Sequence, residues 1–416
     1  GSSSVPATST AGPRIIDVDY TRAAYEIPVQ TGAEWNLKIA DAPAPSYQVR
    51  TTTIPKTTDF WDKLNRIAVN DRAKRAVVTY NFAKPGRDSE KSTRMVLVDL
   101  ETGRKIGISE GEGVWTARAI HDDGERVVVA NLSESDELAG QLGTVRISGN
   151  QMTPLDMWKP YAKRQGPAKE RVVRFAAFGN GGRLITLSQS GDGVIWDFES
   201  RKPLARFNYH GACQPTMSSD RKMLGICGGD IVGMIPLDSR AEPVVKEAPG
   251  MNYWLTTAFS PSGKRFAAAT MSKLMIWNVE NGEVLFEGPV TDVNLREPLI
   301  FPHDDFIVLG KQLLFEYASG IKVWKYGGIN AATSLMGQPL VASLDKNGGS
   351  LFTAKMPHAE ALAVLDKARN DPGLFVLREG VDVAIDVSKV PGQYRQQVQS
   401  SLEKQVAKMK CQVNPG

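Results

Sequence analysis

The sequence has little of the features that would identify a chemistry or a compartment. Only three of its 416 residues are cysteine, which excludes a disulfide-stapled scaffold and a metal site built from four thiolates. Its 50 basic and 46 acidic residues leave a net charge of +4, so nucleic acid is an unlikely partner. No apolar run approaches the ~18 residues of a transmembrane helix, so we expect no membrane span. The remaining composition, 42% hydrophobic with 38 glycines, is that of a globular, turn-rich chain.

Catalytic and cofactor-binding signatures are also missing. The four histidines show no HxH or HExxH spacing, and no GxGxxG, GxxxxGK or GxSxG motif occurs. Aspartate pairs such as Asp122-Asp123 and Asp304-Asp305 fit the tips of turns. We therefore expect no catalytic residue, no metal site and no cofactor, and a protein that is not an enzyme.

The two ends of the chain differ from the middle. Residues 1–34 begin with GSSSVPATSTAGP, which lacks a charged start and an apolar centre, so we expect a flexible linker rather than a signal peptide. Residues 379–416 combine an alternating pattern at 381–387 with helix formers over 393–410. They predict a small β-α extension, which either packs on the main domain or begins a truncated second domain. The compartment stays open between the cytoplasm and export without a visible signal peptide.

Residues 35–378 contain an internal repeat. A short polar turn precedes a basic residue and an apolar run at seven places, centred near residues 73, 124, 181, 221, 263, 304 and 348. The last four intervals match the ~40–45-residue period of four-stranded propeller blades, whereas the first two are longer and need insertions. The pattern predicts an all-β, seven-bladed β-propeller that is joined by one or more strands from its N-terminal side.

A bulky residue recurs at a fixed position after these turns. Trp196, Trp277 and Phe315 fall on one equivalent place, on the third strand of their blades. Such residues are expected to fill the space between neighbouring blades, and truncation of one to alanine would cost about 3–5 kcal/mol.

Two segments carry a family resemblance. Asp192-Gly193 with Trp196-Asp197, and Ala258-Phe-Ser-Pro-Ser-Gly-Lys-Arg-Phe266 with Ile276-Trp277, resemble degenerate WD40 repeats of the bacterial type. The resemblance implies blades near 56–107, 113–150, 171–209, 212–247, 253–288, 295–326 and 337–378. Only one Trp-Asp dipeptide occurs and the Gly-His dipeptide of the family is missing, which removes its usual Asp–His hydrogen-bond network.

The insertions predict where a partner would bind. They fall at 83–92, 131–143 and 151–170, and the strand order of a blade places all three on the same face, around blades one to three. The third mixes aromatic and basic residues, which suits a protein groove or an acidic partner. We expect a non-enzymatic protein-interaction scaffold, with an enzyme site at the central channel or a self-assembling structural protein as alternatives and the oligomeric state open. The candidate partner-binding residues are Trp158, Tyr161, Lys159, Lys163, Arg164, Trp115 and Trp254.

Two cysteines lie symmetrically about one predicted turn. Cys213 and Cys227 are each seven residues from Asp220, so they can face each other across a hairpin. A strained disulfide is conceivable in an oxidising compartment, whereas two reduced, buried thiols fit the hairpin without strain.

Overall fold

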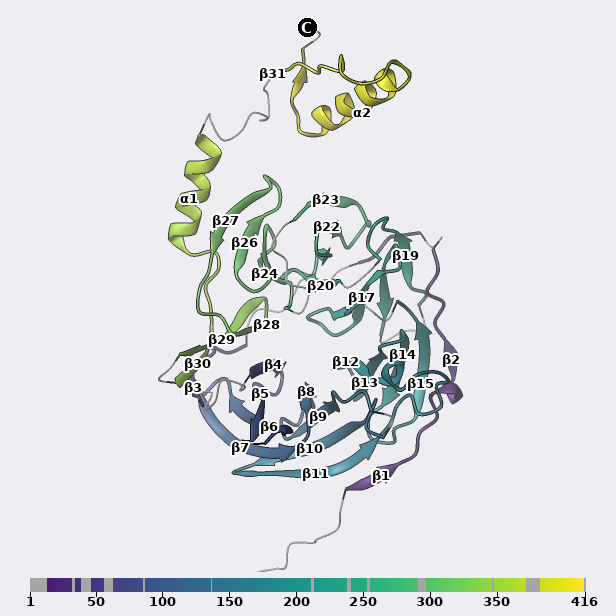
Figure 1. The fold of residues 1–416 in the computed structure, drawn as a ribbon, viewed down its shortest axis with the longest axis vertical. Coiled ribbons are helices and arrows are strands. Elements are labelled where there is room, and N and C mark those ends of the chain that lie inside the picture. Colours follow the sequence, from purple (N-terminus) through teal and green to yellow (C-terminus); the bar gives the residue numbers. More distant parts are fainter. Residues whose placement is uncertain are drawn as a thin grey trace, which may run out of the picture. The chain divides into compact units, whose positions relative to one another are not determined.

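Seven antiparallel sheets follow one another around a central axis in the computed structural model of the chain (Figure 1). In each sheet the first strand lies nearest the axis, and the next strands follow outwards in order. The expected all-β, seven-bladed propeller is thereby confirmed. The structure describes residues 13–31, 34–38, 46–55, 63–84, 87–135, 137–210, 213–237, 241–252, 255–290, 297–345, 348–371 and 382–414.

The blades are numbered here in chain order, with the strands of each blade given from the axis outwards. Blade one contains β4 (Lys63–Asn70), β5 (Arg75–Lys84), β6 (Arg87–Asp99) and β7 (Arg104–Glu112). Blade two contains β8 (Trp115–Ile120), β9 (Arg126–Asn131), β10 (Leu142–Ser148) and β11 (Gln151–Trp158). Blade three contains β12 (Val173–Phe178), β13 (Arg183–Ser188), β14 (Asp192–Asp197) and β15 (Pro203–Asn208). Blade four contains β16 (Thr216–Met217), β17 (Met223–Gly228), β18 (Ile231–Pro236) and β19 (Val244–Glu247).

The remaining three blades complete the ring. Blade five contains β20 (Thr256–Phe259), β21 (Arg265–Ala269), β22 (Lys273–Asn278) and β23 (Val284–Pro289). Blade six contains β24 (Ile300–His303), β25 (Phe306–Leu309), β26 (Leu313–Glu316) and β27 (Ile321–Lys325). Blade seven contains β28 (Ala331–Leu335), β29 (Gln338–Asp345), β30 (Gly348–Thr353) and, from the other end of the chain, β3 (Thr52–Ile54).

Strand β3 closes the ring, because it pairs antiparallel with β30 as the outer strand of blade seven. The expectation that blade seven extends to residue 378 is therefore wrong. Its turn near residue 348 joins the second and third strands, and the turn between its first two strands lies at 335–338 instead. An N-terminal strand takes the outermost position, so the sequence after β30 is not needed for the sheet.

Two further strands add to the outside of the ring. Strand β1 (Arg14–Ile16) pairs in parallel with β11, and β2 (Tyr25–Glu26) pairs in parallel with β15. Between them lies the short helix η1 (Tyr20–Arg22). Residues 14–26, which the sequence placed inside a flexible linker, thus pair with blades two and three. Residues 1–12 of that linker lie outside the described residues.

The core lies between the blades, and one irregularity directs aromatic residues into it. The pairing of the third with the fourth strand shifts just before Trp196, Trp277 and Phe315. These side chains are 0%, 1% and 4% exposed, and each belongs to a buried cluster that combines its own blade with the preceding blade. The equivalent position predicted from the repeat is therefore also equivalent in the sheets.

Residues 358–416 form a second compact unit after the propeller unit of residues 1–357. It contains α1 (Ala359–Asn370), β31 (Asp382–Val383), η3 (Gly392–Tyr394), α2 (Arg395–Lys408) and β32 (Gln412–Val413). Strand β31 pairs in parallel with β32 across α2, so the expected C-terminal strand-helix extension is present. The sequence placed the boundary at 378–379, whereas α1 begins twenty residues earlier because 359–370 is rich in helix formers.

Candidate functional site

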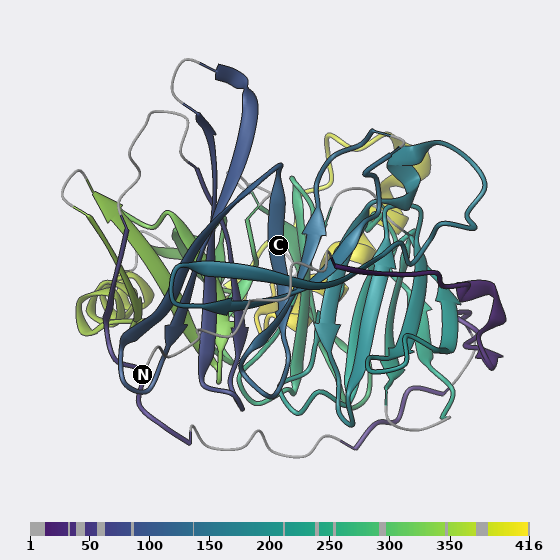
Figure 2. The same ribbon diagram turned by 90° about the horizontal axis from the view of Figure 1, so that it is seen from below.

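Three long connections of blades one and two leave the propeller on one side, here called the insertion face. In blade one, the pairing of β6 with β7 ends at Ser92, but the pairing of β5 with β6 continues to Lys84 and Arg87. In blade two, residues 132–141 join β9 to β10, and residues 159–172, with the short helix η2 (Ala168–Arg171), join β11 to β12 of blade three. Figure 2 shows the β5–β6 hairpin and the connection from β11 to β12 rising from the same side of the ring.

The two connections of blade two pack against each other. The Nζ atom of Lys159 donates a hydrogen bond to the backbone carbonyl of Glu137, 2.5 Å away. Gly140 has a φ of +74°, and a Cβ at this position would collide with the carbonyl oxygen of Arg171. Glycine is required here both for the left-handed backbone and for the close approach. These loops therefore form one continuous surface.

Trp115 joins this surface to the hairpin of blade one. Its backbone carbonyl accepts a hydrogen bond from Asn81 Nδ2 at 3.0 Å, and its backbone amide donates to Thr93 Oγ1 at 2.9 Å. The indole is half-buried at the start of β8, the innermost strand of blade two. Trp115 thus lies on the insertion face near the axis, and its role in partner binding stays a prediction. Trp254 lies outside the described residues.

Trp158 and Tyr161 are core residues, which corrects the expectation that they form a binding surface. Their exposed fractions are 2% and 0%. Trp158 is the last residue of β11 and packs edge-on against Trp196, with ring centroids 5.0 Å apart. The Tyr161 hydroxyl is 2.7 Å from Thr186 Oγ1, which also accepts a hydrogen bond from Trp196 Nε1 at 2.9 Å. The residues expected in a loop insert therefore fill the gap between blades two and three.

The basic residues of the connection between β11 and β12 differ in their contacts with the rest of the protein. Arg164 is ion-paired with Asp192, at 2.9 Å between Nη1 and Oδ2, and with Glu170 at 3.3 Å. Its charge is neutralised within the protein, so it is a poor candidate for partner binding. Lys163 and Lys169 are exposed on the insertion face. Lys159 is half-buried and holds the neighbouring loop.

Three arginines that the sequence reasoning missed lie on adjacent innermost strands. They are Arg66 on β4, Arg118 on β8 and Arg174 on β12, one from each of blades one to three. Arg118 and Arg174 are the extra residues of β-bulges, since the pairing with the second strand skips each of them. Bulges re-aim side chains that a regular strand would place elsewhere.

The three guanidinium groups influence one another electrostatically. Burial lowers the pKa of Arg118 well below its usual value, and the positive charges of Arg66 and Arg174 lower it further. Burial also lowers the pKa of Arg66. Among the described residues, none of the three has a carboxylate within ion-pair distance, although Arg174 donates to Gln189 Oε1 at 3.1 and 2.6 Å. Positive charge that no described carboxylate neutralises is therefore concentrated along the axis on the side of blades one to three.

At the end of the axis opposite the insertion face, by contrast, an arginine is paired with carboxylates. Arg221, from the first hairpin of blade four, reaches Asp71 of blade one at 2.5 Å and Asp122 of blade two at 2.6 Å. Asn70 donates to Asp122 at 2.8 Å and accepts from Arg221 at 2.9 Å. Although burial alone would raise the pKa of Asp122, these hydrogen bonds and the charges of Arg221 and Arg72 lower it. The hairpins of three blades are thus tied together at this end.

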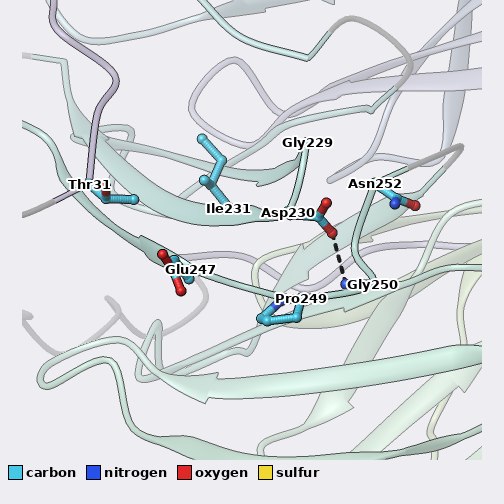
Figure 3. Close-up of a pocket in the computed structure, with 8 residues that line it drawn as sticks. All are labelled: Thr31, Gly229, Asp230, Ile231, Glu247, Pro249, Gly250 and Asn252. Carbon is cyan, nitrogen blue, oxygen red and sulfur yellow. Dashed lines mark hydrogen bonds between the residues drawn. The ribbon is translucent and has the colours of Figure 1, made fainter.

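A shallow pocket lies at the periphery of blade four (Figure 3). It is lined by the β17–β18 turn, by the residues after β19 and by Thr31. Asp230 Oδ1 accepts a hydrogen bond from the backbone amide of Gly250 at 2.8 Å, so this carboxylate serves the local turn. Glu247 is the second carboxylate in the pocket, and no histidine, cysteine or serine lines it.

The two cysteines of blade four are free and buried. Burial raises the pKa of the Cys213 thiol to about 11, and burial also raises the pKa of Cys227 well above its usual value. Both thiols are therefore protonated at neutral pH, and the disulfide alternative is not the state of this structure. Within the described ranges, no three His, Cys, Asp or Glu side chains are placed to hold a metal ion. No helix in the described part of the chain is long and apolar enough to cross a membrane.

Comparisons with known proteins add little to this geometry. A scan against protein-family models found no match, and a search of curated proteins found no significant one. Among solved structures, the chain is similar to one in "Crystal Structure of Mitotic Checkpoint Complex", with 14% sequence identity and a TM-score of 0.46. That similarity covers 78% of this chain and 99% of the other.

Proposed function

We propose that this propeller is a non-enzymatic scaffold that binds a protein partner on its insertion face. The observation that carries the proposal is the contiguity of the face. Four separate parts of the chain meet here: Trp115 is hydrogen-bonded to the strands of the blade-one hairpin, the preceding Val114 carbonyl accepts from the Leu132 amide of the first blade-two connection, and the two connections of blade two pack against each other. Loops that a rigid scaffold holds in place are where binding residues are commonly found.

The charges of this face define the kind of partner. Lys163 and Lys169 are exposed on the connection between β11 and β12, and Glu134 and Glu137 are exposed on the neighbouring loop. A surface with both signs side by side suits a protein whose charges complement it, and such complementarity sets specificity and the association rate more than affinity. It suits nucleic acid less, because the acidic side chains would repel phosphates.

The experiment compares charge reversals on the two faces of the ring. Lys163→Glu with Lys169→Glu alters the insertion face, and Lys202→Glu with Lys222→Glu alters exposed lysines in hairpins on the other face. Each purified double variant and the unaltered chain are used as bait in an extract of the native organism, and captured proteins are quantified by mass spectrometry.

We expect the unaltered chain and the Lys202/Lys222 variant to capture the same partner and the Lys163/Lys169 variant to lose it at least tenfold. Capture that both variants retain equally, or that only the Lys202/Lys222 variant loses, would place binding elsewhere on the ring. Circular dichroism and thermal melts of all three proteins show whether a loss comes from misfolding.

A further inference from the structure

The arginine cluster on the axis has an electrostatic cost that nothing in the described chain offsets. Arg66, Arg118 and Arg174 bring three positive charges to three adjacent strands, and no carboxylate of the described residues pairs with them. The Nε atom of Arg118 is buried and has no hydrogen-bond partner, and its Nη2 atom has only the carbonyl of Val173, at 3.3 Å. A buried, unsatisfied donor on a charged group is costly. Arg164 and Arg201 also have such an Nε atom, but each is ion-paired, whereas Arg118 has no carboxylate partner among the described residues.

The two arginines of the described propeller residues that are almost fully buried are both paired, which shows that the fold can neutralise such groups. Arg201, whose side chain is 4% exposed, lies 2.8 Å from Asp156. Arg221, 8% exposed, is paired with Asp71 and Asp122. The axial arginines, which are half-buried, differ from these two in having no carboxylate partner among the described residues.

The cluster lies between the insertion face and the middle of the axis, since Arg66 is the fourth of the eight residues of β4. Each innermost strand begins at that face, and Arg174 is the second of the six residues of β12, while Arg118 is the fourth residue of β8, three positions after Trp115. The other end of the axis is bridged by Arg221 and its acidic partners. A ligand that reached the cluster would therefore enter from the insertion face.

We propose that Arg66, Arg118 and Arg174 form a binding site for a phosphate group. Guanidinium groups donate paired N–H bonds to oxoanions, and the buried Nε–H of Arg118 is one such donor without an acceptor. A phosphate dianion offsets more of three positive charges than one carboxylate does. Its tetrahedral oxygens can also accept hydrogen bonds from three different strands.

The phosphate has two possible sources, free inorganic phosphate or a phosphorylated side chain of the partner. The second source rests on the proposed function, because a partner bound on the insertion face could insert such a group along the axis. The first does not depend on any partner.

The test is isothermal titration of the full chain with inorganic phosphate at low ionic strength and neutral pH. We expect saturable binding at one site, weakened at least tenfold by Arg118→Met and by Arg174→Met, since methionine keeps the apolar stem and removes the donors. Arg146→Met is the matched control, because Arg146 is half-exposed on β10 and paired with Glu125. It should bind phosphate within twofold of the unaltered chain.

A second titration uses the peptide Gly-Ala-Ser-Ala-Gly with and without phosphate on its serine. Phosphopeptide binding at least tenfold tighter than free phosphate, with no binding of the unmodified peptide, supports a group carried by a partner. Equal or weaker phosphopeptide binding supports free phosphate.

No saturable phosphate binding by the unaltered chain would overturn the proposal, as would equal binding by the Arg118→Met variant with its fold intact. Thermal melts identify a variant that misfolds, and Arg118→Lys then serves instead, with an expected loss of several-fold. The Lys163/Lys169 variant should bind phosphate normally, so failure of the scaffold proposal and failure of this one give different results.

Discussion

Replacement of Trp196 by alanine should destabilise the propeller strongly, because this residue joins blades two and three. Its side chain is fully buried and packs edge-on against Trp158 at 5.0 Å. Its Nε1 atom donates to Thr186 Oγ1 at 2.9 Å. Removal of the indole therefore leaves a cavity in a cluster built from two blades and also leaves Thr186 with one hydrogen bond fewer.

The size of the effect can be worked out from these contacts. Truncation of a buried tryptophan costs about 3–5 kcal/mol, the sum of lost transfer energy and the cavity that remains. The unfolding entropy near 60 °C is about 2.1 cal/mol/K per residue, which gives about 0.75 kcal/mol/K for the 357-residue propeller unit. The melting temperature should therefore fall by about 4–7 °C.

The assay is thermal unfolding followed by circular dichroism, with two reference variants. Trp196→Phe keeps a ring and loses the donor, so it should cost about 1–2 kcal/mol, or roughly a third of the alanine effect. Met271→Ala removes a side chain that is 70% exposed and should leave the melting temperature within about 1 °C. A Trp196→Ala protein that melts within 1 °C of the unaltered chain would refute the interblade role.

Two further substitutions test the closure of the ring and an acidic hairpin. Ile54→Ala in β3 should cost about 2–5 kcal/mol because Ile54 is 1% exposed in the core of blades one and seven, whereas Ile15→Ala in β1, 75% exposed, should cost almost nothing in the same urea titration. Burial alone would raise the pKa of Asp123, but hydrogen bonds from the Arg126 and Glu125 amides and from the Arg126 side chain lower it to about 2. Because this pKa is below the unfolded value of about 3.9, its stabilisation is present above pH 5 and is lost as the pH falls towards 2. Asp123→Asn should cost on the order of 1 kcal/mol at pH 7 in urea unfolding, after solvent screening, and a deficit that does not shrink at pH 3 would contradict this.

The sequence predicts the repeat well where short turns and strands keep a regular spacing. Trp196, Trp277 and Phe315 were placed at one position from spacing alone, and the sheets place them there with the same shift in pairing. The predicted bounds of blade seven were wrong because the turn before its third strand, and that strand itself, resemble the start of a repeat. Nothing local in Thr52–Ile54 indicates a partner some three hundred residues later, and only the need to close the ring selects it.

The candidate site was predicted less well, for a related reason. Trp158 and Tyr161 interleave with basic residues, and the pattern of an exposed aromatic–basic loop is the same as that of a buried strand end followed by a charged connection. Burial was decided by the neighbouring blade, which supplies Trp196 and Thr186 as partners. The distinction depends on tertiary contacts that a linear pattern does not contain.

The axial arginines carried a signal that alignment of the repeats makes visible. Arg66, Arg118 and Arg174 each place an arginine within the first strand of a blade, and they do so in three consecutive blades. One such residue can direct its charge to solvent, but innermost strands converge on one axis, so three bring like charges together. At the other end of the axis the same convergence is neutralised by Asp71 and Asp122. The propeller therefore has ion pairs across one end of its axis, whereas the three axial arginines have no carboxylate partner among the described residues.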